Sequence, residues 1–255
     1  MREEITERRR KTRTPGLSAK LMFTLLLVLF CAVIISGNDR KNQIDIYRQV
    51  KLAIVGDLMS HDEQLAAALN NQTGEYDFNY AFREVSQYLQ SADLTIGNLE
   101  TVLAGAETGY SGYPRFNSPD AYAAAIAAAG FDLLTTANNH SNDRNEPGIF
   151  RTLEILDQYG IGHIGTYNSA EAREEIKLVT INSVSFAFLS YSYGTNGIPL
   201  VQGHEWSVNP LDKDLIYNDI QRAKDLGPDF IIVLPHMGDE YAEEPSERYK
   251  EWVRF

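Results

Sequence analysis

The chain has 255 residues, 44% hydrophobic side chains and a formal net charge of −12. A chain of this length and composition can bury one large core or two smaller ones. Residues 38–255 hold 16 basic and 32 acidic side chains, because seven of the 23 basic and three of the 35 acidic residues lie in positions 1–37. This excess of 16 negative charges repels nucleic acid at long range, so we expect no nucleic-acid partner.

The first 37 residues differ from the rest of the chain. Positions 1–20 are basic and are predicted to lie in the cytoplasm. In the segment 21–37 that follows, residues 21–35 carry no charge and are near the short limit for crossing a hydrocarbon core of about 30 Å. A retained single-pass membrane anchor and a secretory signal with a cut after Ser36 and Gly37 both remain open. Either interpretation puts the main domain outside the cytoplasm, at the cell membrane if the anchor is retained.

Cys31 is the only cysteine and lies inside the apolar segment. The exported part can therefore form no internal disulfide, and its stability must come from the core or partly from metal. Lipoprotein processing at Cys31 is a weaker option, because residues 28–30 are not the small residues that such a cut needs. Residues 38–50 are predicted to form a polar linker, and 51–255 a single domain.

From residue 51, short apolar runs alternate with helical patterns, and no repeat is present. Strands are predicted within 51–57, 93–100, 131–140, 161–165, 176–181, 184–191 and 229–234, and helices at 62–70, 79–92, 119–130, 146–159, 169–175, 209–227 and 245–255. This alternation, with one hairpin at Asn182 and Ser183, predicts an α/β layered domain with a mixed β-sheet flanked by helices. No Gly, Asn or Pro ends the last helix, so the C-terminal part of the domain is expected to be missing.

Two of the helices carry specific expectations. The segment 79–92 is predicted to be one amphipathic helix, whose apolar face would hold Phe82, Val85, Tyr88 and Leu89. The alanine-rich helix is predicted to start at Pro119, with the Ser118 side chain as its cap.

Four apolar runs end on residues that can bind a metal ion. KLAIVGD ends at Asp57, DLTIGNLE at Asn98 and Glu100, FDLLTTANNH at Asn138, Asn139 and His140, and FIIVLPH at His236. We interpret the runs as buried strands whose carboxyl ends lie on one edge, where open α/β sheets bind ligands. Each residue also has an ordinary structural interpretation, such as a turn cap for Asp57. The recurrence predicts one shared site.

Carboxylates, imidazoles and a carboxamide together suit Mn, Zn or Fe, whereas a cage of oxygen atoms alone would suit Mg or Ca. In a two-metal layout, Glu100 would bridge two ions about 3.5–4 Å apart. Asp57 would bind one ion, and Asn139 with His236 the other. His140 would then be a general acid or a donor to the transition state.

The motifs at these positions resemble a known family. IVGDLM, ADLTIGNLET, PRFNSPD followed by GFDLLTTANNHSND, IGHIGT with YSYGTNG, and LPHMGDEY are similar, in this order, to blocks of the CapA-type poly-γ-glutamate capsule biosynthesis proteins. That family looks like a branch of the calcineurin-like metallophosphoesterases, and the resemblance covers about residues 50–245. It implies a metallophosphoesterase-like domain, with metal bound by Asp57, Glu100, Asn139 and His236 and with His140 as the catalytic residue.

Asn98, Arg115, Thr195 and Asn196 are predicted to contact a substrate, the last two because of the same resemblance. Thr195 and Asn196, in a loop bounded by glycines, are expected to face the site, although a plain tight turn explains them nearly as well. Asn98 lies beside the bridging Glu100. Arg115 could attract an anionic ligand to an otherwise acidic domain, with a surface ion pair as the alternative.

The sequence also departs from the family pattern. The first superfamily motif is Asp-x-His, but Met59 stands two residues after Asp57. His61 could replace the missing histidine, although we favour its interpretation as a histidine on a surface helix. Glu100 stands where an Asp is usual. The final Gly-His-x-His motif would lie beyond Phe255. The set of metal ligands is therefore expected to be incomplete.

Two functions remain open. The first is a membrane-anchored extracytoplasmic CapA-like protein that takes part in poly-γ-glutamate biosynthesis or export. Its partners would be other subunits of a polyglutamate synthase complex and an anionic polymer. The second is an active metal-dependent phosphoesterase that acts on an extracytoplasmic phosphoester.

Overall fold

The computed structural model describes residues 48–255, so the apolar segment 21–37 and the basic residues before it lie outside the described part of the chain. Among residues 48–255, no helix has both the length and the apolar character needed to span a bilayer. The strands are β1 (Leu52–Leu58), β2 (Leu94–Leu99), β3 (Leu133–Thr135), β4 (Gly162–Ile164), β5 (Lys177–Ile181), β6 (Val184–Ser192) and β7 (Phe230–His236). The α-helices are α2 (Asp62–Ala68), α3 (Asn79–Phe82), α4 (Ser86–Leu89), α5 (Asp120–Ala129), α6 (Asn145–Gln158), α7 (Ala170–Glu174), α8 (Lys213–Asp225) and α9 (Glu247–Arg254).

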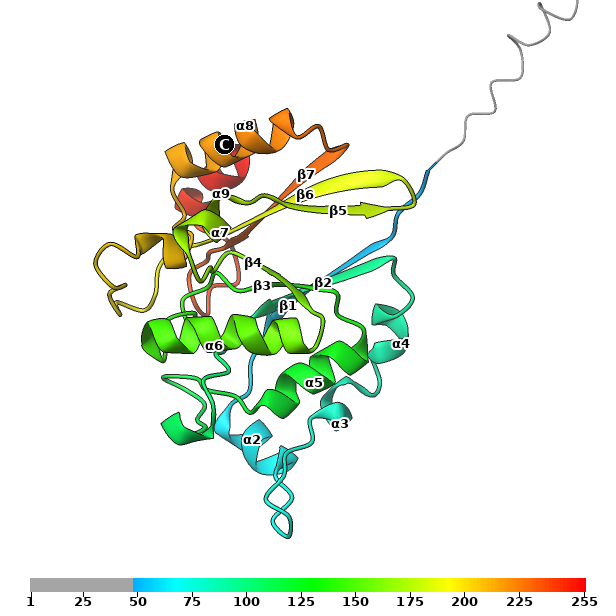
Figure 1. Cartoon of the computed structure of the whole chain (residues 1–255), viewed down its shortest axis with the longest axis vertical. Helices are drawn as coiled ribbons and strands as arrows, with labels where there is room; N and C mark the ends of the chain where they lie inside the picture. Colours follow the sequence, from blue (N-terminus) through cyan, green and yellow to red (C-terminus); the bar gives the residue numbers. More distant parts are fainter. Residues whose placement is uncertain (1–47) are drawn as a thin grey trace, which may run out of the picture. The chain divides into compact units, whose positions relative to one another are not determined.

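The strands form two sheets (Figure 1). The first is parallel throughout, in the order β1-β2-β3-β4, whereas in the second β5 is antiparallel and β7 parallel to the central strand β6. The α/β class is therefore confirmed, but the expectation of one mixed sheet is wrong. After β4 the chain passes through α7 into the hairpin β5–β6, which packs over the first sheet instead of extending it.

The two sheets and their helices form four layers. Between the sheets lies an apolar core to which β2, β3 and β4 contribute Leu94, Ile96, Leu133 and Ile164, and to which β6 contributes Val184, Phe186 and Phe188. A larger core fills the space between the first sheet and helices α2 to α6. On the far side, α8 and α9 pack against β6 and β7. The order helices, sheet, sheet, helices leaves the strand ends as the place where the two sheets can share a site.

Only two of the four ligand-bearing strands are buried as expected. All six residues of β2 and all three of β3 are buried, because each strand has a neighbour on both sides and layers on both faces. β1 and β7 are edge strands of their sheets, and Ile54 and Phe230 are each 56% exposed. The prediction of buried strands is therefore wrong for β1 and β7.

The segment 79–92 is not one helix. The chain forms the two short helices α3 and α4, and only Phe82 and Leu89 of the predicted apolar face are buried. Val85 and Tyr88 are 45% and 69% exposed. Because the chain breaks between α3 and α4, Phe82 and Leu89 both pack into the core with residues of α5. The expected single helix would have placed all four residues on one apolar face.

Two helix starts also differ from the prediction. Ser118 does not cap α5: its hydroxyl bonds to Ser60 (2.6 Å) and Thr101 (2.8 Å), and the helix begins at Asp120. α8 begins at Lys213 instead of 209, because residues 209–211 pair with the end of β6 through backbone hydrogen bonds to Ser192. By contrast, the hairpin turn is confirmed, since Asn182 and Ser183 both have positive φ angles (50° and 62°).

Candidate metal centre

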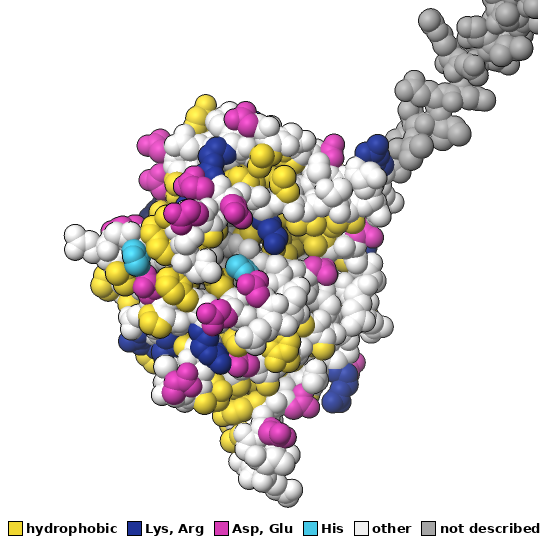
Figure 2. All heavy atoms as spheres, in the orientation of Figure 1, with side chains coloured by type: hydrophobic (Ala, Val, Ile, Leu, Met, Phe, Trp, Pro, Cys, Tyr) yellow, Lys and Arg dark blue, Asp and Glu magenta, His cyan; other side chains and the backbone are white. Residues whose placement is uncertain are grey.

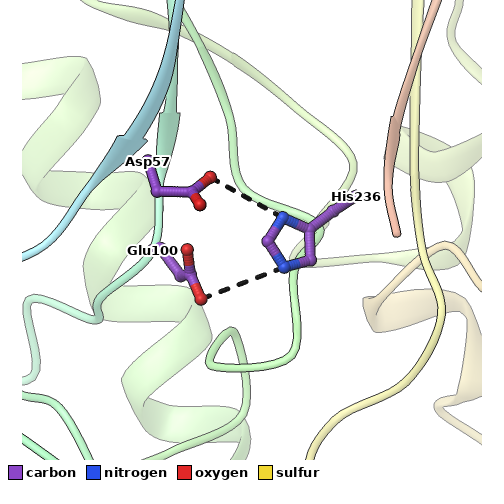
Figure 3. Close-up of side chains that lie close together, drawn as sticks. All are labelled: Asp57, Glu100 and His236. Atoms are coloured by element: carbon purple, nitrogen blue, oxygen red, sulfur yellow. Dashed lines mark ion pairs between the residues drawn. The ribbon is translucent and has the colours of Figure 1, made fainter. Parts of the chain in front are cut away.

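Three predicted metal ligands from three strand ends lie together (Figure 3). One ligand atom from each of Asp57, Glu100 and His236 lies within 4.8 Å of the others. His236 Nδ1 is 3.8 Å from Asp57 Oδ1, and its Nε2 is 3.9 Å from Glu100 Oε1. Asp57 and Glu100 come from the neighbouring parallel strands β1 and β2, as the strand-end argument predicted, whereas His236 comes from the second sheet. The site therefore lies where the carboxyl ends of both sheets meet.

Asn139, the fourth predicted ligand, lies on the Nε2 side of the histidine. Its Oδ1 is 2.7 Å from His236 Nε2, in the loop that follows β3. His236 thus lies about equally close to Asp57 and to Glu100. The layout in which Glu100 bridges two ions stays a prediction.

Asn98 connects the ligands to one another. Its Nδ2 donates to Asp57 Oδ1 (2.8 Å) and lies 3.1 Å from His236 Nδ1. Its Oδ1 accepts from the Thr135 hydroxyl (2.9 Å) and from Asn138 Nδ2 (3.2 Å). Asn98 therefore orients both Asp57 and His236, which makes it a supporting residue as well as a possible substrate contact.

The electrostatics of the cluster favour a bound cation. Burial, followed by repulsion from and a hydrogen bond with the nearby Asp57 carboxylate, raises the pKa of Glu100 from its ordinary value of 4.5 to about 8. Burial also lowers the pKa of His236, against the attraction of Asp57. A neutral imidazole and two crowded carboxylates are the donor set that Mn, Fe or Zn binds, so the residues fit such an ion.

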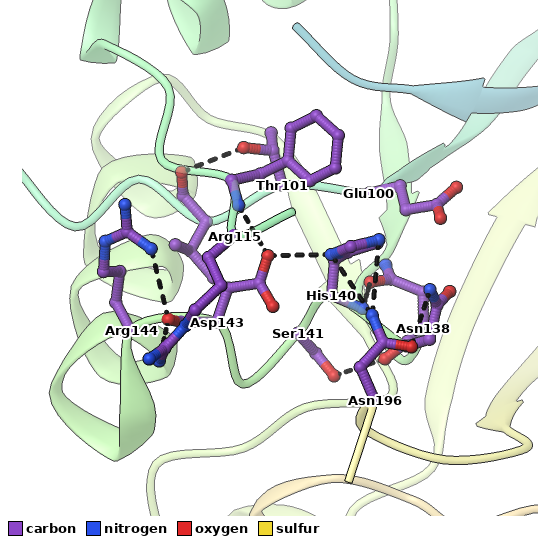
Figure 4. A network of polar contacts seen from close by, with 12 residues as sticks. Glu100, Thr101, Arg115, Asn138, His140, Ser141, Asp143, Arg144 and Asn196 are labelled. Carbon is purple, nitrogen blue, oxygen red and sulfur yellow. Dashed lines mark hydrogen bonds and ion pairs between the residues drawn. The ribbon is translucent and has the colours of Figure 1, made fainter. Parts of the chain in front are cut away.

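His140 forms a buried pair with an acid that the sequence analysis did not single out. His140 Nδ1 lies 2.8 Å from Asp143 Oδ2, and the same oxygen accepts the Phe116 backbone N–H (2.6 Å). His140 is 6% exposed and Asp143 is fully buried. Because Asp143 holds the Nδ1 proton, the other ring nitrogen is left facing the side on which Glu100 lies (Figure 4). The signal in the sequence was an acid three residues after the histidine, within one turn.

The neighbours of His140 fix its ring. Phe116 packs edge-on against the ring, with centroids 4.7 Å apart. Asn138 Oδ1 accepts the His140 backbone N–H (3.0 Å), which holds the turn after β3. Asn196 Nδ2 lies 3.4 Å from both ring nitrogens, and its Oδ1 accepts from Asn139 Nδ2 (3.2 Å). Asn196 therefore faces the site, as expected for its loop.

The other predicted residues lie outside the cluster. The Thr195 hydroxyl donates to the Ile198 carbonyl (2.7 Å) inside its own turn. Arg115 is exposed and donates to the Asp143 backbone carbonyl. His61 precedes α2 and packs edge-on against Phe116, with centroids 5.0 Å apart, in keeping with a helix-associated histidine.

A groove of about 200 Å³ runs from the cluster along the open edges of the two sheets. Its lining includes Ile54 and Gly56 of β1, and Leu234 and Pro235 of β7, beside the ligands. In addition, the Tyr193 ring stacks on His236, with centroids 5.9 Å apart and planes inclined by 15°. The resemblance includes Tyr193 in the same loop as Thr195 and Asn196, which is expected to face the site. Its contact with His236 could not be predicted, because it joins the ends of β6 and β7 across their parallel register.

Comparison with known proteins places the domain in a family. Residues 51–255 match the family model described as bacterial capsule synthesis protein PGA_cap. The chain is 24% identical over 247 residues to the capsule biosynthesis protein CapA of Bacillus anthracis, covering 93% of this chain and 59% of that protein. It is 21% identical over 236 residues to the PGA biosynthesis protein CapA of Bacillus subtilis strain 168, covering 90% and 60%. The chain thus spans about three fifths of the length of these relatives.

Among solved structures, the NAD nucleotidase of Haemophilus influenzae is similar to 80% of this chain, which covers 35% of that structure. The TM-score is 0.47 and the sequence identity 16%. At this level, the likeness to metallophosphoesterases stays a prediction from the sequence motifs.

Proposed function

Because the chain belongs to the bacterial capsule synthesis protein family PGA_cap, we propose that it takes part in poly-γ-glutamate capsule biosynthesis or export through a divalent-metal centre. The proposal includes a single membrane anchor within 21–37, a main domain outside the cytoplasm, and other subunits of a polyglutamate synthase complex as partners. The observation that supports it most is the convergence of Asp57, Glu100 and His236 within 4.8 Å, in a domain matched by this family over residues 51–255.

The roles of the residues follow from their contacts. Asp57, Glu100, Asn139 and His236 would hold the divalent metal. Asn98 would orient Asp57 and His236 through the hydrogen bonds of its Nδ2. A divalent ion held there supplies Lewis acidity toward a phosphoryl or carbonyl oxygen. His140, oriented by Asp143, can give or take a proton on the side of Glu100, and Asn196 can donate to a substrate oxygen beside it.

The second candidate is an active phosphoesterase that uses the same centre. The buried His140–Asp143 pair favours it, because an imidazole held by a carboxylate is the arrangement expected of a general acid.

Metal analysis of the purified full-length chain tests the centre. Wild-type protein should hold Mn, Zn or Fe, and Glu100→Ala and Asn139→Ala variants should lose it while keeping the wild-type circular dichroism. Equal metal content in all three proteins would refute the centre. Assays with phosphomonoesters and phosphodiesters then separate the candidates: turnover that disappears in His140→Ala supports the phosphoesterase, and bound metal without turnover supports the capsule role.

The cellular role needs a separate test. In the organism that encodes this chain, deletion of the coding sequence should remove poly-γ-glutamate from the cell surface, and the wild-type gene should restore it. Fractionation and protease protection of the restored protein test the anchor and the side of the membrane. Unchanged surface polymer after deletion would refute the proposed role.

A further inference from the structure

Two arginine side chains converge on one backbone carbonyl near the candidate centre. Arg115 and Arg144 both donate to the Asp143 carbonyl oxygen, and Arg144 also donates to the Ser111 hydroxyl (2.6 Å) (Figure 4). Within residues 48–255, neither guanidinium has a carboxylate oxygen within 4.0 Å. Two positive charges are thus held side by side without an ion-pair partner of their own.

Other partly or fully buried arginines of the domain are paired. Arg151 forms an ion pair with Asp120 (2.7 Å), and Arg173 with Asp219 (2.6 Å). The Asp143 carboxylate acts on Arg144 through its charge but forms no ion pair with it: its Oδ2 accepts from His140 and from the Phe116 N–H, and its buried Oδ1 has no hydrogen-bond partner. Burial and the charge of Arg115 lower the pKa of Arg144, and the charge of Asp143 offsets only part of this. An anion bound between the two guanidinium groups would relieve this repulsion.

The pair can be reached from solvent and belongs to an acidic domain. Arg115 is exposed, and Tyr113 in the same loop is 67% exposed, so a ligand can approach from solvent. The basic side chains on the face shown in Figure 2 form a few separate patches among more widely spread acidic ones. Residues 38–255 carry 16 basic against 32 acidic side chains. A polyanion is repelled by most of such a surface, so it needs a local cationic site to bind.

Asp143 separates Arg115 and Arg144 from the catalytic candidate His140. In Figure 4 the guanidinium groups lie on the far side of Asp143 from His140 and Glu100. Phe116, which follows Arg115, packs against the His140 ring at 4.7 Å. A group bound by the arginines is therefore not the group that reacts at His140. It belongs to a more distant part of an extended ligand.

We propose that Arg115 and Arg144 form a subsite that binds a pendant carboxylate of an anionic polymer whose neighbouring units pass the metal centre. The proposal rests on the proposed capsule function, which supplies poly-γ-glutamate as the polymer. A guanidinium presents paired N–H donors that match the two oxygens of a carboxylate, and two guanidinium groups together can neutralise more than one charge of the chain. The subsite explains how a strongly acidic domain binds a polymer of the same sign.

Binding of a fluorescein-labelled poly-γ-glutamate oligomer to the full-length chain in detergent, followed by anisotropy at low salt, tests the subsite. The Arg115→Gln/Arg144→Gln variant should raise Kd about tenfold or more. An Arg115→Lys/Arg144→Lys variant should recover only part of the affinity, because an ammonium group lacks the fork of donors. The control is Arg83→Gln/Arg48→Gln, which removes the same charge from two exposed residues away from the centre.

Each outcome decides the proposal. An unchanged Kd in the double glutamine variant, or an equal loss in the control, would overturn it. So would a wild-type protein that does not bind the oligomer, or one from which inorganic phosphate displaces it more effectively than glutarate at the same ionic strength. If the double variant misfolds by circular dichroism, Arg115→Gln alone gives the same test, since that side chain is exposed. Metal content of the same samples is measured separately, so that failure of the subsite and failure of the metal centre are distinguishable.

Discussion

In the metal-free protein, Glu100→Gln is predicted to change the dependence of stability on pH. The Glu100 pKa is about 8 in the folded protein, against an ordinary value of 4.5. Between these values the folded state holds a proton that the unfolded state has released, so stability falls as pH rises from about 4.5 to about 8 and is level above. Glutamine cannot ionise, and it keeps the shape of the protonated acid. The variant should therefore lack this decline.

The size of the effect follows from the difference of about 3.5 pH units. At about 1.36 kcal/mol for each unit, the upper limit is about 5 kcal/mol. Part of the shift comes from repulsion by Asp57, whose side chain is 52% exposed and therefore screened by water and salt. We expect about 2–4 kcal/mol, which corresponds to roughly 5–15 °C in Tm for a domain of this size.

Thermal unfolding of both proteins in EDTA, at pH values from 5 to 9, measures this difference. The two proteins should be close in stability near pH 5, and Glu100→Gln should be the more stable near pH 8.5. Addition of Mn²⁺ at pH 8.5 should stabilise the wild type much more than the variant, because the ionised Glu100 carboxylate would help to hold the ion and a glutamine amide would not. Parallel stability curves for the two proteins in EDTA would refute the reasoning.

Three further predictions concern single residues. Asn98→Ala should weaken Mn²⁺ binding by about 10–100-fold in a chelator competition, because Asp57 and His236 lose the amide that orients them, and unchanged affinity would contradict that role. Arg173→Leu should lower the free energy of urea unfolding by about 1.5–3 kcal/mol, because the buried Asp219 loses two hydrogen bonds and keeps only Arg222 and the Tyr191 hydroxyl, with metal affinity as the unaffected control. Leu134→Ala, at a fully buried position of β3, should cost about 2–5 kcal/mol in the same assay, and a loss below 1 kcal/mol would show that the core collapses around it.

The order of strands and helices could be predicted from the sequence, because it depends on local patterns. The apolar run of β2, the glycine that ends α5 at Gly130 with a φ of 101°, and the Asn182–Ser183 turn each define an element from within a few residues. The start of α8 could not be predicted in this way. Residues 209–211 pair with β6, a strand more than fifteen residues earlier, and no local signal at Asn209 announces that contact.

The sequence by itself determined which side chains can form the centre, since Asp57, Glu100 and His236 each end an apolar run. The end of such a run can be recognised from a few neighbouring residues. Only the tertiary structure decided that the strands divide into two sheets and that His236 reaches the ligands from the second one. It also decided that Asp143 holds His140 and that Arg115 meets Arg144 at a carbonyl. Such contacts join residues through the packing of layers and loops, and the free energy of that packing is a property of the whole domain, which no short window of sequence contains.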